Sequence, residues 1–268
     1  MAKVGRKPDL ASVIGVILAA VAIVGGLLLE GGAISDIAQH TAAIIVLGGT
    51  IGATMLNSPM PIFLGAFRRL ACVFQEHTEG PDAIIDKLID FATKARKQGI
   101  VSLEQEAAEI EDPFLRKALT LAVDGTDLQE LRKMMELEIE IHEHEAEAEA
   151  KVFEQAGGYA PTVGILGAVM GLIQVMKNLA NIDAVGHGIA VSFVATVYGV
   201  GIANLFFLPA AGKIKARAQE EIRMKEMTLE GITGIVEGLN PKLIRWKLEA
   251  YSHGRKAAKQ SAAAKVEA

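Results

Sequence analysis

Residues 157–176 read GGYAPTVGILGAVMGLIQVM, a run of twenty residues without a charged side chain. A helix of that length rises about 30 Å, which matches the hydrocarbon core of a bilayer. Three further runs share this length and apolar character: residues 10–29, 37–56 and 187–208. The sequence therefore predicts an all-α membrane protein with four transmembrane helices and a large helical cytoplasmic domain between the second and the third.

The composition of the chain agrees with this fold class and excludes others. Of its 268 residues 51% are hydrophobic and only 5% aromatic, and the 27 glycines suit membrane helices that pack through small residues. Gly48-x-x-x-Gly52 and Gly167-x-x-x-Gly171 each place two glycines on one helix face, where contacts between helices are expected. A net charge of −5 argues against a nucleic-acid binder, which needs a basic face. Cys72 is the only cysteine, so we expect no intrachain disulfide and no cysteine metal cage.

Basic residues set the expected orientation. They flank the first run, the end of the second, the start of the third and the end of the fourth, whereas the two short turns between runs hold only Lys177. The positive-inside rule then places both termini and the middle domain in the cytoplasm. We divide the chain into a transmembrane hairpin with helices at about 10–29 and 37–56, a helical domain, two further transmembrane helices and a cytoplasmic tail: residues 1–56, 57–155, 156–210 and 211–268.

The middle domain shows helical periodicity and two helix signals. One helix is predicted from Asp82 to Gln98, followed by Gly99 in the left-handed position. Ser102 and Gln105 have the spacing of a capping box, which predicts that the next helix starts at once. A third helix is predicted to begin near Asp127 and to run unbroken into the membrane.

The chain lacks the usual signatures of an enzyme, a cofactor site or a metal site. It has no G-x-x-x-x-G-K-[ST] loop and no G-x-S-x-G elbow. His142 and His144 are two residues apart and diverge on a helix, so we expect no metal there and no cofactor elsewhere. None of the four runs holds Asp or Glu at depth, so any ion that crosses the membrane needs a carboxylate from another chain.

Mildly polar residues and two prolines interrupt the last two runs. Hydrogen bonds between helices and a pore lining are both open interpretations of the polar ones: Thr162, Gln174, Ser192, Thr196, Tyr198 and Asn204. Pro161 and Pro209 have similar expected depths near the cytoplasmic side. Each is either a hinge within a helix or an ordinary proline at a helix start or end.

The segments YAPTVGILGAVMGL (159–172), ATVYG (195–199) and LP (208–209) resemble the third and fourth spans of flagellar stator A subunits, the MotA and PomA type. The order of four spans, the acidic loop and the basic carboxyl tail agree as well. This resemblance implies an inner-membrane ring of five A subunits around a dimer of B subunits of the MotB or PomB type, whose aspartate binds the ion. Ion flow then turns the ring against the rotor protein FliG.

The resemblance also implies roles for single residues. The stretch ARKQGIVSLE (95–104) is similar to the family's torque-generating segment, which assigns the rotor contact to Arg96 and Glu104 with Lys97 as helper. Helix dipoles alone could also explain these charges, because basic residues end one helix and an acidic residue begins the next. Pro161 and Pro209 match the prolines that couple ion flow to movement.

The nature of the ion is expected to follow from Ala168. Sodium-driven members carry a threonine there, and a dehydrated sodium ion needs several oxygen ligands, whereas a proton needs only a carboxylate. Thr196 is common to both kinds. Protons are therefore expected, and the sodium-driven kind is the alternative. Three other functions are alternatives: a proton channel subunit of the ExbB or TolQ type, a self-contained transporter and a passive scaffold. Proteins of the ExbB and TolQ type have three spans.

Overall fold

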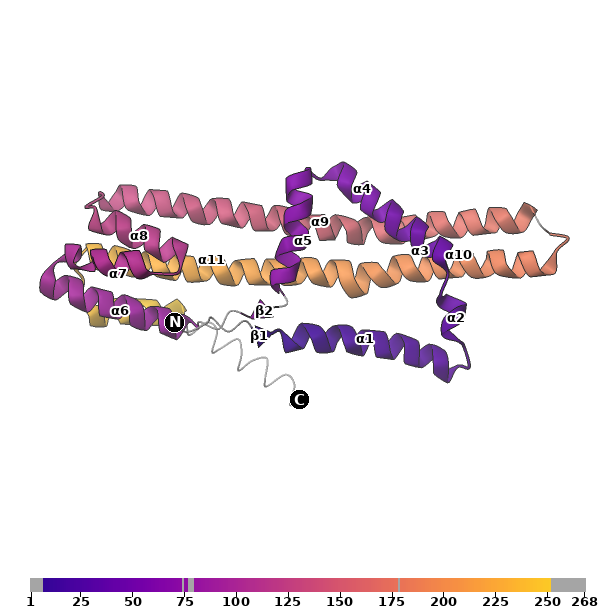
Figure 1. Ribbon diagram of the computed structural model, residues 1–268, viewed down its shortest axis with the longest axis horizontal. Helices are drawn as coiled ribbons and strands as arrows, with labels where there is room; N and C mark the ends of the chain where they lie inside the picture. Colours follow the sequence, from indigo (N-terminus) through magenta and orange to yellow (C-terminus); the bar gives the residue numbers. More distant parts are fainter. Residues whose placement is uncertain (1–6, 74, 77–79, 178, 252–268) are drawn as a thin grey trace. The chain divides into compact units, whose positions relative to one another are not determined.

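The computed structural model describes residues 7–73, 75–76, 80–177 and 179–251 (Figure 1). The fold class is confirmed, since nearly every described residue lies in a helix and four helices are long and apolar enough to cross a membrane. The described chain forms two compact units. We call residues 80–144 and 218–251 the polar unit, and residues 7–76 and 145–217 the span unit.

The first half of the span unit contains the first two apolar runs. Its elements are β1 (Lys7–Pro8), α1 (Leu10–Leu29), α2 (Ile34–Ile37), α3 (His40–Ala43), η1 (Ile44–Gly48), α4 (Gly49–Asn57), α5 (Met60–Val73) and β2 (Gln75–Glu76). The two-residue strands pair antiparallel, with Lys7 opposite Glu76. The predicted bounds of the first span are confirmed by α1, which Asp9 caps by accepting a hydrogen bond from the Ala11 amide at 3.2 Å.

The second span begins later than the sequence predicted. Ile37 ends the short helix α2, the chain bends at Ala38 and Gln39, and the spanning helix runs from His40 to Asn57. The Ile37 carbonyl accepts a hydrogen bond from the Tyr198 hydroxyl, far away in the sequence. Hydropathy alone does not reveal such a break, because it depends on the backbone conformation and on a contact with a distant residue.

The third and fourth spans lie within much longer helices: α9 (Leu128–Lys177), and α10 (Ile182–Ile202) continued by η3 (Ala203–Phe207) and α11 (Leu208–Val236). The unbroken helix from near Asp127 is confirmed, and Asp127 caps it by accepting from the Gln129 amide at 2.9 Å. Pro161 lies inside α9, and Pro209 follows the π-helical turn η3 inside a continuing helix. The helix-start and helix-end interpretations of the two prolines are therefore wrong.

The polar unit combines helices that precede the third span in the sequence with helices that follow the fourth. Its elements are α6 (Pro81–Gln98), η2 (Ile100–Leu103), α7 (Glu104–Glu109), α8 (Pro113–Val123), residues 128–144 of α9, residues 218–236 of α11 and a last helix at 241–251. The predicted helix from Asp82 to Gln98 is confirmed to within a residue, and Gly99 has a φ of +83°.

The predicted capping box at Ser102 and Gln105 is wrong. The Ser102 hydroxyl donates to the Gly99 carbonyl at 2.7 Å and closes the 3₁₀ turn η2. The α-helix then starts at Glu104 without a side-chain cap. Serine can bond backward to a carbonyl as readily as forward to an amide, so the spacing alone does not decide between the two.

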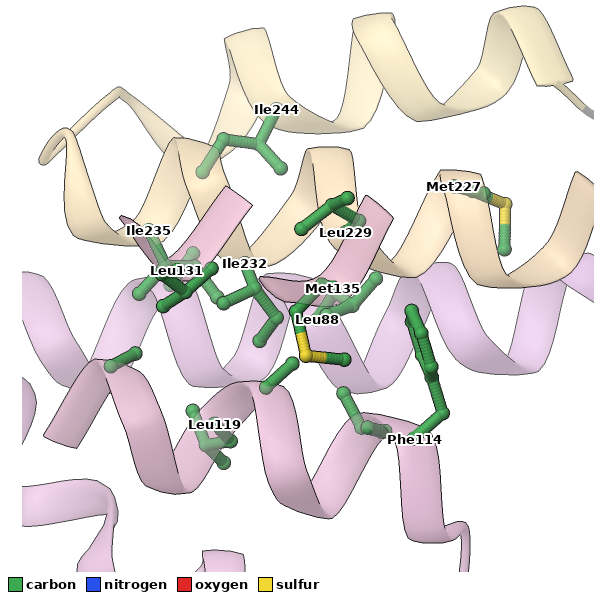
Figure 2. Packing of buried hydrophobic residues seen from close by; sticks show 14 of the residues in the cluster. Leu88, Phe114, Leu119, Leu131, Met135, Met227, Leu229, Ile232, Ile235 and Ile244 are labelled. Atoms are coloured by element: carbon green, nitrogen blue, oxygen red, sulfur yellow. The ribbon is translucent and has the colours of Figure 1, made fainter. Parts of the chain in front are cut away.

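The core of the polar unit joins two distant parts of the sequence (Figure 2). Leu88, Leu119, Leu131 and Met135 come from the segment before the third span, and all are buried. Their partners come from the segment after the fourth span: Met227, Leu229, Ile232, Ile235, Ile244 and Leu248. The end of the chain thus completes the domain that the loop begins.

Candidate functional site

The candidate rotor surface lies at the turn between α6 and α7. Arg96 and Lys97 occupy the last turn of α6, and Glu104 is the first residue of α7. All three side chains are exposed, and no ion-pair partner occurs for any of them among the described residues. The helix dipoles favour these signs by about 0.3–1 kcal/mol each, which stabilises the charges without covering them.

The neighbouring charges on the same two helices do have partners. Lys94 of α6 and Glu106 of α7 form an ion pair, whose hydrogen bond lowers the pKa of Glu106 below its ordinary value. This pair ties α6 to α7 behind the turn. Arg96, Lys97 and Glu104 lie on the turn next to this pair, and their charges stay accessible to another molecule.

The second candidate site lies where α9 and α10 pack in the span unit. A Cβ on Gly164 would lie 2.9 Å from the Ala195 carbonyl oxygen, and one on Gly199 would lie 2.5 Å from the Ala160 carbonyl oxygen. Gly171 and Gly188 make a similar pair further along. Small residues thus bring the two backbones together, as predicted for the glycines of the third span.

The glycine pair of the second span behaves differently. Gly48 and Gly52 have no other atom within 4 Å of a Cβ built on them, among the parts of the chain that the structure describes. The expected contact through this face is not made within one subunit.

Ala168 and Thr196 flank the α9–α10 contact. Gly167 lies against Ala195, and Ala168 and Thr196 are the next residues on their helices. Both are half-buried. Pro161 precedes Ala168 by two helical turns, so these two residues share a face of α9. The structure thus gathers three of the four expected ion-pathway residues along one helix pair.

Pro209 lies somewhat apart from this group. Gly157 of α9 packs against Leu208, the residue before Pro209, whereas Pro161 is four residues further along α9. Because the two helices run antiparallel, the two prolines are offset along the helix pair by about five residues, or roughly 8 Å. Pro209 has no N–H to offer to the preceding turn, and the π-helical η3 adapts the helix to that loss.

Most polar side chains of the last two spans bind their own helix. Thr196 donates to the Ser192 carbonyl at 3.3 Å, and Ser192 in turn donates to the Gly188 carbonyl at 2.9 Å. Asn204 donates to the Val200 carbonyl at 2.9 Å. Tyr198 differs, since its hydroxyl reaches the Ile37 carbonyl of another element. Bonding between helices, one of the two open interpretations, thus holds for Tyr198.

Sequence reasoning missed an ion-pair cluster at the end of the spans. Asp9, only 8% exposed, pairs with Lys213, and its Oδ2 lies 3.5 Å from Nη2 of Arg217 on α11. The Lys213 hydrogen bond lowers the pKa of Asp9 to about 2. The sequence does contain a signal for this cluster: an acidic residue directly before the first run and basic residues just after the fourth.

The two histidines of α9 have separate carboxylate partners. His142 Nε2 lies 2.9 Å from Glu221 Oε2, and His144 Nε2 lies 3.8 Å from Glu140 Oε1. Within the described residues no three His, Cys, Asp or Glu side chains gather as a metal site would require. The side chain of Cys72 lies outside those described.

The sequence and the fold were compared with known proteins. Residues 106–227 match the MotA/TolQ/ExbB proton channel family, and residues 13–99 match the motility protein A N-terminal model. The chain is 35% identical to motility protein A of Bacillus subtilis over 91% of this chain and 90% of that one. It is 36% identical to motility protein A of Helicobacter pylori, strain 26695, over 91% and 95%.

Solved structures agree with these matches. The chain resembles the C. jejuni MotAB structure with a TM-score of 0.87 and 33% identity, over 91% of this chain and 95% of that one. It resembles the flagellar MotAB stator complex of Bacillus subtilis with a TM-score of 0.86 and 35% identity, over 94% and 99%. Together with the four spans and the close-packed α9–α10 pair, these likenesses lead to one conclusion: the chain belongs to the motility protein A family, within the MotA/TolQ/ExbB proton channel proteins.

Proposed function

We propose that this chain is the A subunit of a flagellar stator, in which it forms an ion channel with a B subunit of the MotB type. Homologous A subunits assemble with MotB in stator structures, and the spans of this chain contain no Asp or Glu of their own. A carboxylate supplied by the B subunit accounts for that lack. Five copies around a B dimer form the ring.

The observation that carries the mechanical role is the set of exposed charges at the α6–α7 turn. Arg96, Lys97 and Glu104 have no ion-pair partner among the described residues, whereas Lys94 and Glu106 next to them are paired. Exposed charges without an ion-pair partner in the described chain can attract complementary charges on another protein. The rotor protein FliG is that partner, and the polar unit is the torque domain.

The orientation follows from the basic residues at the span ends. Both termini and the polar unit lie in the cytoplasm, and the protein crosses the inner membrane four times. Pro161 and Pro209 transmit the ion's passage to the polar unit, because each weakens the regular bonding of a helix that continues past it.

The driving ion is the proton, because Ala168 offers no oxygen ligand where a sodium ion would need one. Swimming speed tests this in cells that depend on this chain and its B subunit. We expect a protonophore to stop swimming and external sodium to have no effect. A speed that follows sodium would contradict the proton assignment, and no swimming under any condition would favour the ExbB-type function.

A further inference from the structure

A pocket of about 350 Å³ opens in the polar unit beside the candidate rotor surface. It lies where α6, α8 and α11 end, and each of these helices is followed by a glycine with positive φ: Gly99, Gly125 and Gly238. Such glycines turn the chain away at once. Three helices that stop close together leave a hollow between their last turns.

Most side chains that line this pocket are apolar, and Thr126 and Arg96 are the polar ones. The most deeply buried residues of the lining are at most 6% exposed: Ala92, Ala122 and Ile235. Other apolar residues of the lining are half-buried: Ala95, Ile100 and Leu239.

The polar backbone groups at these helix ends are largely used within the chain. The Gly99 amide donates to the Ala95 carbonyl at 2.8 Å, and the Leu239 amide donates to the Gly234 carbonyl at 3.0 Å. The Thr126 amide donates to the Leu121 carbonyl at 3.1 Å. These three amides are therefore not free to bind a ligand, and the apolar side chains of the lining offer contact area for an apolar group.

The rim of the pocket carries one charge. Arg96 is the only charged residue among those that line it, and its side chain is exposed and without an ion-pair partner in the described chain. Lys97 is next to it on α6. A cation at the mouth of an apolar pocket fits a partner that presents a carboxylate beside an apolar side chain.

We propose that this pocket receives an apolar side chain of an acidic rotor segment, whose carboxylates meet Arg96 and Lys97. This inference rests on the proposed function and deepens it. Charges attract and orient the partner, but exposed ion pairs hold weakly. The buried apolar side chain supplies the binding free energy that lets the contact resist load, as buried anchor residues do in other interfaces.

The pocket can be filled without touching a charge. Ala95 is a half-buried wall residue next to Arg96, so Ala95→Leu places extra carbons in the hollow, whereas Ala95→Ser leaves it open. Ala83→Leu makes the same size change at an exposed position of α6 that does not line the pocket. Val236→Thr keeps the volume but places a hydroxyl on the wall contributed by α11.

The experiment measures swimming speed at rising viscosity for each variant, together with the amount of subunit in the membrane and its co-purification with the B subunit. We expect Ala95→Leu to reduce speed at high load by about half or more, with Val236→Thr acting in the same direction. Ala95→Ser and Ala83→Leu should swim like the parent. Subunit amount and co-purification should stay unchanged in all four.

Other outcomes would overturn the inference. If Arg96→Glu stops motility while Ala95→Leu swims normally under load, the pocket has no occupant and the charge contact stands alone. Normal swimming by both variants would remove the proposed rotor contact as well. Equal losses from Ala95→Leu and Ala83→Leu would point to the general surface of α6. If Ala95→Leu no longer co-purified with the B subunit, the pocket would be filled by another part of the stator and not by the rotor.

Discussion

Arg96 decides between a structural and a functional account of the α6–α7 turn. In the structural account its charge only offsets the dipole of α6, a contribution below about 1 kcal/mol that any cation would supply. In the functional account it meets an acidic partner. Because Arg96 is exposed and has no ion-pair partner among the described residues, reversing its charge breaks no ion pair within that part of the chain.

Arg96→Glu should therefore reduce swimming severely while the amount of subunit in the membrane stays normal. The physical reason is repulsion between the new carboxylate and the acidic partner. Lys133→Glu is the matched control, because Lys133 is an exposed cation of the same unit, also without an ion-pair partner among the described residues. Swimming speed and immunoblots of membranes measure both effects, and equal swimming by the two variants would count against a torque role.

Asp9 gives a prediction about pH. Its pKa falls from 3.8 to about 2 in the folded chain, chiefly through the Lys213 hydrogen bond. Because the folded pKa is the lower one, the stabilisation is present above pH 4 or so and is lost as pH falls through the folded value. The shift corresponds to about 2 kcal/mol.

Asp9→Asn should lower the melting temperature of the detergent-solubilised complex at neutral pH, and the difference from the parent should shrink toward pH 2. Thermal melting at several pH values measures this. Asp36→Asn is a suitable comparison, because Asp36 is exposed and, within the described residues, accepts hydrogen bonds from the nearby Ala33 and Ser35 alone. A melting temperature unchanged at pH 7 would show that the Asp9 cluster adds nothing to stability.

Among the elements, the α9–α10 pair depends on the absence of side chains. Gly199→Ala would place a Cβ 2.5 Å from the Ala160 carbonyl oxygen, so the two helices must separate. Gly201→Ala, two residues away, meets no atom within 4 Å in the described chain. We expect Gly199→Ala to lower both the yield of folded subunit and swimming, and Gly201→Ala to lower neither. Comparable losses from both would place the close contact on another face.

The accuracy with which the sequence predicts helix bounds also differs from one element to the next. The first span and the helix from Asp82 to Gln98 could be predicted almost to the residue, because apolar length and a following glycine are local signals. The break before His40 could not, because it depends on contacts with a distant residue, Tyr198. The 3₁₀ turn before Glu104 was missed because one serine can bond in two directions.

The candidate site was predictable where it depended on residue type and motif. The exposed charges at the α6–α7 turn and the glycines of α9 were found in this way. The pairing of Lys94 with Glu106 and the pocket at three helix ends were not, since both depend on which helices meet in space. The core contacts of Met227 and Leu248 were not predictable either, because these two residues lie far in the sequence from the helices against which they pack.

At the scale of the whole molecule, the polar unit is discontinuous in sequence. A chain ended after residue 217 would lose four fully buried side chains: Met227, Ile232, Ile244 and Leu248. Burying each contributes about 1.5–3 kcal/mol, and together they approach the net stability of an ordinary domain. Residues 80–144 should then be cut quickly by protease in membrane vesicles, whereas a chain ended after residue 251 should resist. Equal resistance would mean that the loop folds alone.

The discontinuous core also sets an order of events during synthesis. The loop leaves the ribosome after the second span has been made, but the helices that close its core follow only after the third and fourth spans. For that interval Leu88, Leu119 and Leu131 lack their partners, which leaves apolar surface open to chaperones and to aggregation. Maturation of this subunit is thus timed by insertion of its last two spans, and a translational pause between them would lengthen the vulnerable period.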